Sequence, residues 1–247
     1  MSILNFRLST LLHSPPAFRP SSVLIIIVAL AIWIVAFQMR SRVIELHCFS
    51  APDTCRYENI NSFDRRFFIA ESESAHEWSF VTQNAAGVVA FTVPVLLHGL
   101  AAGVAGVPVM AALAAVGTDW VVIAQAVTLN GAVNEISKLI TQRPRPHVYK
   151  HPKVAGDNPH HYTSFYSGHT SFVMASMLAL FLVLLGRGAG RIQWLVPVAG
   201  IGMFLLILTG TFRVYAGRHF LTDVIAAVLA GSFFALLSVI RNKKAIY

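Results

Sequence analysis

The 247-residue chain has few charged residues, which make up only 12% of it, and just 11 of its residues are acidic. Soluble domains usually carry about a quarter charged residues, so this scarcity excludes an ordinary cytosolic fold. Only two cysteines are present, and the 16 glycines have no three-residue period, which excludes a disulfide-rich scaffold and a collagen-like repeat. Hydrophobic residues are abundant instead, at 55%, and favour a polytopic helical membrane protein with an unexplained net charge of +8.

Six apolar runs predict helices that cross a membrane, for which about 20 residues are needed. They lie at 22–38, about 85–103, 120–140, about 170–185, about 194–211 and about 220–240. Thr118 and Asp119 are typical of a helix N-cap, so we expect the third helix to start at Trp120. Residues 104–116 either extend the second helix or form a re-entrant turn. The predicted fold is all-α, with both termini on one side and the active site at one membrane interface.

Two polar segments interrupt the apolar runs. Residues 43–78 hold seven of the 11 acids and are predicted to form an aqueous segment. Cys48 and Cys55 lie within it, with six residues between them, and either form a disulfide on an oxidising face or remain two ordinary thiols. Residues 141–166 form a second polar segment, rich in proline, histidine and basic residues.

Ionisable residues near the helix ends form three clusters: Lys138 with Arg145-Pro146, then Ser167-Gly168-His169, then Arg213 with His219 and Asp223. Alternate helices return the chain to the same membrane face, so these clusters can converge there. Charged residues at membrane depth are costly and are candidates for function. Three cations, two histidines, one carboxylate and a helix N-terminus are a suitable set for binding a phosphate group.

The histidines suggest two chemical roles. His219 and Asp223 are four residues apart and would share one face of a helix. A carboxylate there can accept a proton from one ring nitrogen of His219 and leave the other nitrogen nucleophilic. His169 then takes the other proton-transfer role: it protonates the departing oxygen and later activates water.

The arrangement resembles the type-2 phosphatidic-acid phosphatase superfamily over residues 85–240. That family has the motifs Lys-x6-Arg-Pro, Pro-Ser-Gly-His and Ser-Arg-x5-His-x3-Asp, which correspond here to Lys138–Pro146, Tyr166–His169 and Phe212–Asp223. Two positions depart from the pattern, because Tyr166 replaces the proline and Phe212 replaces the serine. Neither departure removes the nucleophile, the acid or a charge, so we expect activity to survive.

The resemblance implies a role for each matched residue. It implies that phosphate is bound by Lys138, Arg145, Arg213, Ser167 and Gly168, that His219 becomes a phosphohistidine supported by Asp223, and that His169 is the acid and base. No metal and no cofactor are expected, because acids are too scarce for a two-metal site and the three cations take the place of the metal.

Other polar residues are assigned structural roles. Arg143 and Arg218 match no motif position and are expected to flank membrane helices in the ordinary way. We expect Glu135 to pair with Lys138, although contact with the substrate is the alternative. His98 and Asp119 are expected to be polar residues at helix ends or in packing, and solvated loop positions are expected for His147, His151, His160 and His161.

The predicted function is that of an integral-membrane lipid phosphatase, with residues 1–247 as one domain. Phosphatidate, phosphatidylglycerophosphate, a polyprenyl diphosphate and the 1-phosphate of lipid A all fit what the resemblance implies. One alternative is a phosphotransferase that passes the phosphoryl group to a second lipid, and another is an anion transporter or channel. The expected partners are the bilayer and its lipid phosphate, with no nucleic acid, and the sequence does not indicate an oligomeric state.

Basic residues in loops predict the orientation. Arg7 and Arg19 balance Arg40 and Arg42 around the first helix, but Arg187 and Arg191, with the basic residues at 241–244, favour the cytoplasm for that end. The active site and both cysteines would then face the periplasm or exterior, at a bacterial inner membrane. On this interpretation the +8 reflects orientation and substrate binding.

Overall fold

A computed structural model of the chain describes residues 19–68, 71–188 and 192–246, so Arg7 and Arg191 lie outside the described residues. Within these ranges all regular secondary structure is helical. Six helices are long and apolar enough to cross a membrane: α2 (Pro20–Val43), α5 (Glu73–Ala105), α6 (Val109–Thr141), α8 (Gly168–Gly186), α9 (Ile192–Tyr215) and α10 (Leu221–Arg241). The prediction of an all-α protein with six membrane spans is confirmed.

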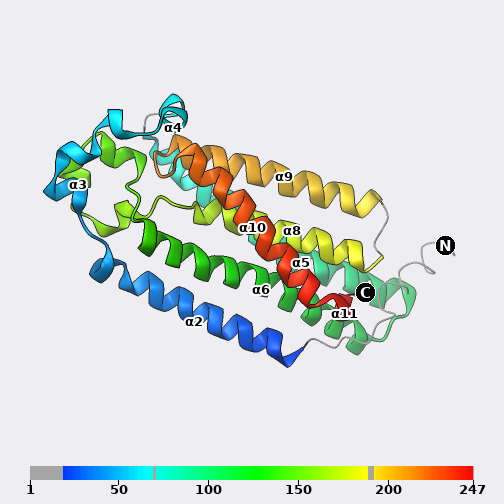
Figure 1. The fold of residues 1–247 in the computed structure, drawn as a ribbon. Helices are drawn as coiled ribbons and strands as arrows, with labels where there is room; N and C mark the ends of the chain where they lie inside the picture. Colours follow the sequence, from blue (N-terminus) through cyan, green and yellow to red (C-terminus); the bar gives the residue numbers. More distant parts are fainter. Residues whose placement is uncertain (1–18, 69–70, 189–191, 247) are drawn as a thin grey trace.

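The bundle is organised around α8, which packs against α5, α6, α9 and α10, whereas α2 packs on α6 at one edge (Figure 1). Small buried side chains such as Ala86, Ala90 and Ala126 line the contacts between helices, together with Val173 and Leu180. Small residues let helix backbones approach closely, which is how helices associate when lipid removes the hydrophobic drive between them.

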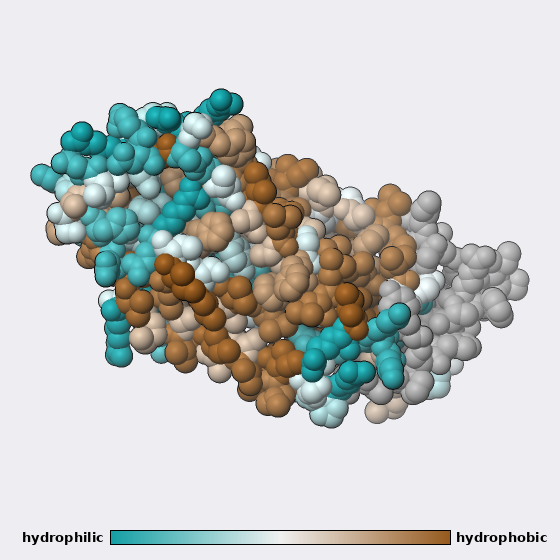
Figure 2. All heavy atoms as spheres, in the orientation of Figure 1, coloured by the Kyte–Doolittle hydropathy of each residue, from teal (hydrophilic) through white to brown (hydrophobic). Residues whose placement is uncertain are grey.

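The outer surface matches a bilayer. Large apolar side chains are exposed along it, including Leu96, Phe204 and Leu229. On the face drawn in Figure 2, hydrophobic residues cover the middle of the molecule, and hydrophilic residues gather toward its two ends. A soluble monomer does not expose a continuous apolar surface of this kind. The chain is therefore an integral membrane protein.

The two polar segments fold against each other at one end of the bundle. The first contains α3 (His47–Ser50), α4 (Ser62–Arg66) and one-turn helices at Pro52–Cys55 and Tyr57–Asn59; the second contains α7 (Pro152–Ala155) and one-turn helices at Pro146–Tyr149 and Pro159–Tyr162. A last short helix, α11 (Lys243–Ile246), lies at the opposite end (Figure 1).

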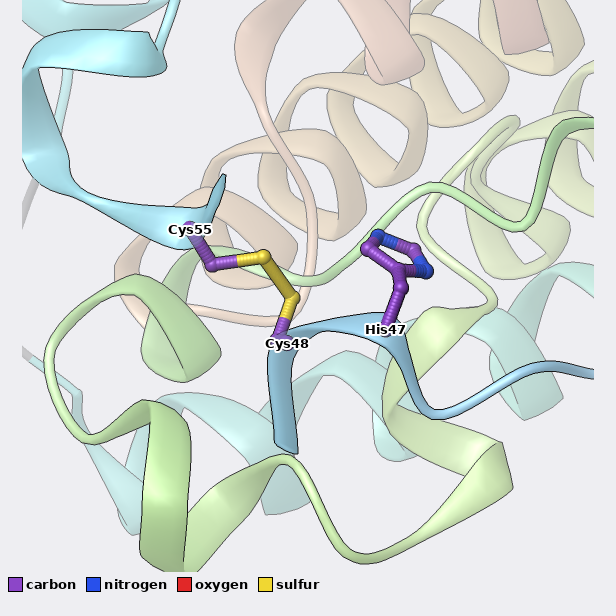
Figure 3. Close-up of side chains that lie close together, drawn as sticks. All are labelled: His47, Cys48 and Cys55. Carbon is purple, nitrogen blue, oxygen red and sulfur yellow. A yellow bond between two sulfur atoms is a disulfide. The ribbon is translucent and has the colours of Figure 1, made fainter. Parts of the chain in front are cut away.

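Cys48 and Cys55 form a disulfide with a Cα–Cα separation of 5.4 Å, and His47 lies beside it (Figure 3). Buried Tyr162 joins this region to the second polar segment, because its hydroxyl accepts from the Cys48 amide (3.1 Å) and donates to the Gly156 carbonyl (2.8 Å). The three side chains at 47, 48 and 55 are close enough to hold a metal ion. Thiolates are the metal-binding form of cysteine, so the disulfide removes the sulfur ligands such a site would need.

The predicted start of the third helix at Trp120 was wrong. Helix α5 ends at Ala105 and is capped by Gly106, which has the left-handed φ of 67°, and α6 starts at Val109 directly after Pro108. Residues 104–116 are thus divided between two helices and a short connection. Thr118 does not cap a helix; its hydroxyl donates to the carbonyl of Ala114 one turn earlier (2.9 Å), as it does inside a continuous helix.

The second helix also starts earlier than expected, at Glu73. The Ser72 side chain caps it by accepting from the Ala75 amide (3.3 Å). Helix α5 therefore extends out of the apolar belt and carries the acidic residues Glu73 and Glu77 on its first turns. This extension brings His76 and Ser79 to the end of the bundle where the polar segments lie.

A buried charged cluster joins three helices at the other end. Both oxygens of Asp119 are bonded: Oδ1 accepts from Arg187 Nε (2.9 Å) and Nη2 (2.6 Å), and Oδ2 lies 2.8 Å from His98 Nε2. All three side chains are at most 2% exposed. This is the packing role expected for His98 and Asp119. It also gives Arg187 a structural reason for its position, so Arg187 no longer counts as evidence for orientation.

Candidate active site

A cavity of about 360 Å³ lies at the end of the bundle covered by the polar segments. Its apolar lining consists of Trp33, Phe37, Phe80 and Phe172, and its polar lining of Arg40, Gln83, Asn130, Asn134, Glu135, Lys138, Arg145, His169, Arg213 and His219, with Gly131 and Gly168. Six of the eight predicted site residues are among these. The other two, Ser167 and Asp223, are buried but do not line the cavity.

Lys138 lies near the end of α6 and is bonded to Glu135, one turn earlier, with Nζ donating to Oε1 over 2.8 Å. The expected structural pair is present, and both residues also line the cavity. A third residue joins them: Arg40 of α2 donates from Nε (2.8 Å) and Nη2 to Glu135 Oε2. One carboxylate thus holds two cations at the cavity wall.

Arg145 and Arg213 each form side-chain hydrogen bonds through one terminal nitrogen of the guanidinium. Arg145 Nη2 donates to the Thr163 hydroxyl (2.9 Å), and Arg213 Nη1 donates to His76 Nδ1 (3.0 Å) and Ser79 Oγ (3.2 Å). The Nε atoms of both arginines are buried and have no hydrogen-bond partner among the described residues. Because buried donors are normally paired, these groups are suited to an anion in the cavity.

His219 is oriented by a backbone carbonyl. Its Nδ1 lies 2.6 Å from the Ser164 oxygen, and since a carbonyl can only accept, Nδ1 carries the proton and Nε2 keeps its lone pair. Burial, followed by the positive charges of Arg213 and Arg145, lowers the pKa of His219 well below its ordinary value, and the bond to Ser164 only partly opposes this. His219 is therefore a neutral imidazole with one nitrogen available as a nucleophile.

The predicted hydrogen bond between Asp223 and His219 was wrong. The shortest distance, from His219 Nδ1 to Asp223 Oδ2, is 3.9 Å. Asp223 Oδ2 instead accepts from the Ser164 hydroxyl (2.6 Å) and the Phe220 amide (2.9 Å). His219 lies before α10, so the rule that residues four apart share a helix face does not apply to this pair. Asp223 therefore acts on His219 indirectly, by holding Ser164.

His169 is the second residue of α8. Its ring packs edge to face against Phe80 of α5, with the ring centroids 4.5 Å apart. Its Nε2 is buried and unpaired within the described part of the chain. Gly168 lets the start of α8 approach α6, since a Cβ there would lie 3.0 Å from Asn134 Oδ1 and 3.4 Å from Lys138 Nζ. The start of α8 therefore places backbone amides and His169 close to Lys138.

Ser167 does not contact the cavity, because its hydroxyl lies 3.0 Å from that of Thr170. Its predicted contact with phosphate has no support in this geometry. Tyr166, at the position of the motif proline, is buried; its hydroxyl donates to the Asn130 carbonyl (3.1 Å) and its own carbonyl accepts from Asn134 Nδ2 (2.7 Å). The substitution thus ties the second motif to α6. Phe212 faces a different groove, beside Trp78 and Tyr215.

Arg143 has a larger role than flanking a helix, so that expectation was wrong. Its Nη1 donates to Asp223 Oδ1 (2.5 Å) and its Nη2 to Asp64 Oδ2 (2.7 Å), while its guanidinium covers the Phe220 ring at 4.3 Å. Arg143 therefore links the carboxylate of Asp223 to the first polar segment. No pattern in the sequence signals this link, because Asp64 is 79 residues away.

The side chain of Asp64, a residue of α4, is buried against the start of α10. It accepts from the Thr222 amide (3.0 Å) and hydroxyl (2.7 Å) and from Asn61 Nδ2 (2.6 Å). Burial acts to raise the pKa of Asp64, but these bonds and that from Arg143 together lower it below its ordinary value. An ionised carboxylate at a helix N-terminus is favoured by the helix dipole. The first polar segment is thereby attached to the loop that carries His219.

The expectation of solvated histidines was wrong for His147. It is buried, with Nδ1 3.1 Å from the Gly217 carbonyl and its ring 4.4 Å from that of His161, measured between centroids. The contact fastens the second polar segment to the same loop. His151 and His160 are exposed, as expected.

Comparison with known proteins gives one match. A family model described as the PAP2 superfamily matches residues 119–247, slightly more than half of the chain, and this range contains all eight predicted site residues. No curated protein and no solved structure matches the chain. Arg40, Asp64 and His76 lie outside the matched range.

Proposed function

The chain belongs to the PAP2 superfamily, and on this premise we propose that it is an integral-membrane phosphatase that releases phosphate from a lipid phosphate monoester or diphosphate. One observation carries the proposal. The unprotonated Nε2 of a neutral histidine, His219, lies at a buried cavity that is also lined by Lys138, Arg145 and Arg213. A neutral nucleophile among fixed cations suits attack on a phosphoryl group.

In the first proposed step, His219 Nε2 attacks phosphorus, a P–N bond forms and the P–O bond to the leaving group breaks. The three cations neutralise the non-bridging oxygens, as a metal ion does in other phosphatases. His169, in its protonated form, gives a proton to the departing oxygen. In the second step a water molecule gives a proton to His169 and attacks the phosphohistidine, which releases inorganic phosphate and restores His219.

A lipid substrate is supported by the apolar part of the cavity. Trp33 and Phe37 from α2 and Phe80 from α5 line the same space as the cations. Phe37 and Phe80 are also exposed on the outer surface, at 48% and 43%. A substrate can thus keep its tail against apolar side chains while its phosphate reaches the cations.

The test is phosphate release from a lipid phosphate by purified protein in excess EDTA, with vanadate as an inhibitor. We expect His219→Ala to lower the rate by about 10³-fold or more, and the exposed loop variant His151→Ala to leave it unchanged. Activity that EDTA abolishes would contradict the metal-free mechanism. Release only when a second lipid is supplied would favour the phosphotransferase, and anion transport that survives His219→Ala would favour the transporter.

For orientation, we propose that the cavity faces the periplasm or exterior of a bacterial cell and the opposite end faces the cytoplasm. The exposed basic residues Arg241, Lys243 and Lys244 lie at that opposite end. The disulfide near the cavity fits an oxidising compartment. After treatment of intact cells with a reductant that cannot cross membranes, an impermeant maleimide should label Cys48 and Cys55, and labelling only after lysis would reverse the orientation.

A further inference from the structure

Helix α2 completes the cavity, although it lies outside the range that matches the family. It contributes Trp33, Phe37 and Arg40, which are spaced four and three residues apart and so lie along one face of the helix. The two aromatic residues lie deeper in the apolar belt than Arg40, at successive helical turns. This face thus runs from apolar side chains to a cation, in the same order as the tail and headgroup of a lipid.

Arg40 is positioned as a binding group. It is 7% exposed, although arginine at the end of a membrane helix can extend into water. Glu135 and Phe37 hold it, the latter with its ring 4.5 Å from the guanidinium carbon, and Nη1 lies 3.3 Å from His160 Nδ1. An arginine has five N–H donors, so these contacts leave hydrogens on both terminal nitrogens for a ligand. Arg42, two residues later, is exposed.

The charge of the cavity exceeds what a single phosphate needs. Its lining holds four cations and the carboxylate of Glu135, a formal charge of +3, and the protonated form of His169 adds one more. A phosphate monoester carries about −2 at neutral pH. A diphosphate monoester carries roughly one negative charge more, and so comes closer to the charge of the lining. The fourth cation, Arg40, lies on the wall formed by α2, in contact with both Glu135 and Phe37.

We propose that Arg40 binds the second phosphate of a lipid diphosphate and makes this class the preferred substrate, an inference that rests on the proposed function. His219 Nε2 attacks the terminal phosphorus, and the bond from that phosphorus to the bridging oxygen breaks. The bridging oxygen takes the proton from His169, and a lipid monophosphate leaves. Arg40 neutralises the charge of this leaving phosphate, which the alcohol released from a lipid monophosphate does not carry.

The test compares farnesyl diphosphate with farnesyl monophosphate, two substrates with the same tail. We expect wild-type enzyme to have the higher kcat/KM for the diphosphate. Arg40→Gln should lower the ratio of the two kcat/KM values by about tenfold to a hundredfold, the effect of losing a hydrogen bond to a charged group. Arg42→Gln, on the same helix but exposed, should leave the ratio unchanged.

A second variant separates binding from local damage. Arg40→Gln leaves Glu135 with Lys138 alone, so a disturbed Lys138 could weaken both substrates. The double variant Arg40→Gln/Glu135→Gln keeps the net charge of the cavity, and it should show the same lowered ratio.

An equal loss on both substrates in both variants would overturn the role of Arg40 while leaving the proposed function intact. A wild-type preference for the monophosphate would also overturn it. Wild-type protein that releases phosphate from neither substrate would instead refute the proposed function.

Discussion

The bundle carries two buried charged clusters, one at each end, and α6 contributes to both. At one end Asp119 of α6 is bonded to Arg187 and His98. At the other end Lys138 of the same helix lies with Arg40, Arg145 and Arg213 around a cavity. Asp119 and Lys138 are 19 residues apart, or about 28 Å along the helix. The chemical groups are alike, but their surroundings differ.

The difference lies in the balance of charge. Around Asp119 the carboxylate and the guanidinium neutralise each other. Around Lys138 the cations outnumber the carboxylates, and two arginine Nε atoms have no partner in the described ranges. A balanced buried pair holds helices together, whereas an unbalanced one needs an anion that the chain itself does not supply. Charge balance therefore separates a packing cluster from a binding site, and this comparison can be tested from both ends.

The largest effect is expected for Arg187→Met. It leaves the Asp119 carboxylate buried with only His98 as a partner, and breaking a buried pair in this way costs about 3–5 kcal/mol. The midpoint of unfolding in detergent should fall, while kcat per folded molecule stays the same because the cavity is distant. Lys244→Met, an exposed cation at the same end, is the control. A loss of kcat with unchanged stability would contradict the packing role.

A smaller effect is expected for Lys138→Met, and it should lower the rate of phosphate release rather than the stability. The Glu135 carboxylate keeps both bonds from Arg40, so stability should change by less than about 1 kcal/mol. The rate should fall by about 10²- to 10³-fold, the usual cost of removing one group that stabilises a developing anion. Phosphate release and thermal unfolding measured on the same preparation decide the point. Destabilisation as large as that of Arg187→Met would make the two ends equivalent.

The smallest expected effect is a pH dependence that comes from the cationic end. The pKa of His219 is lowered in the folded protein, so the unfolded chain binds a proton there more readily. The free energy of unfolding is therefore highest above the histidine pKa of the unfolded chain, about 6.5. It decreases as the pH falls below that value, by about 1 kcal/mol between pH 7 and 5.5. His219→Gln should flatten this dependence of the unfolding midpoint, and His151→Gln should not. An equal slope in both variants would contradict the shift.

Motif spacing was sufficient to find six of the residues that line the cavity. The charged residues and histidines among them lie near ends of helices that alternate in direction, so their convergence follows from the order of the spans. They are Lys138, Arg145, His169, Arg213 and His219. Spacing could not show how the side chains are bonded. Asp223 turns to Ser164 because His219 precedes the helix, and no pattern in the sequence marks that boundary.

The residues that the sequence did not reveal are those whose partners are remote. Arg40 acquires its role from Glu135, 95 residues away, and Arg143 from Asp64, 79 residues away. Either arginine by itself matches an ordinary cation beside a membrane helix. Likewise, the start of α6 at Val109 could not be distinguished from a re-entrant turn by composition, because both contain small apolar residues. Only the packing of α6 against its neighbours decides between them.

The contact between Asp64 and Thr222 has a consequence for biogenesis. The two residues are 158 positions apart, so Asp64 is synthesised long before its partner exists. The loop that carries His219 cannot take its final form until α10 has been inserted into the membrane. A partly inserted chain therefore holds the acidic segment and separated cations, but no assembled cavity. The cavity is completed at the last stage of membrane insertion.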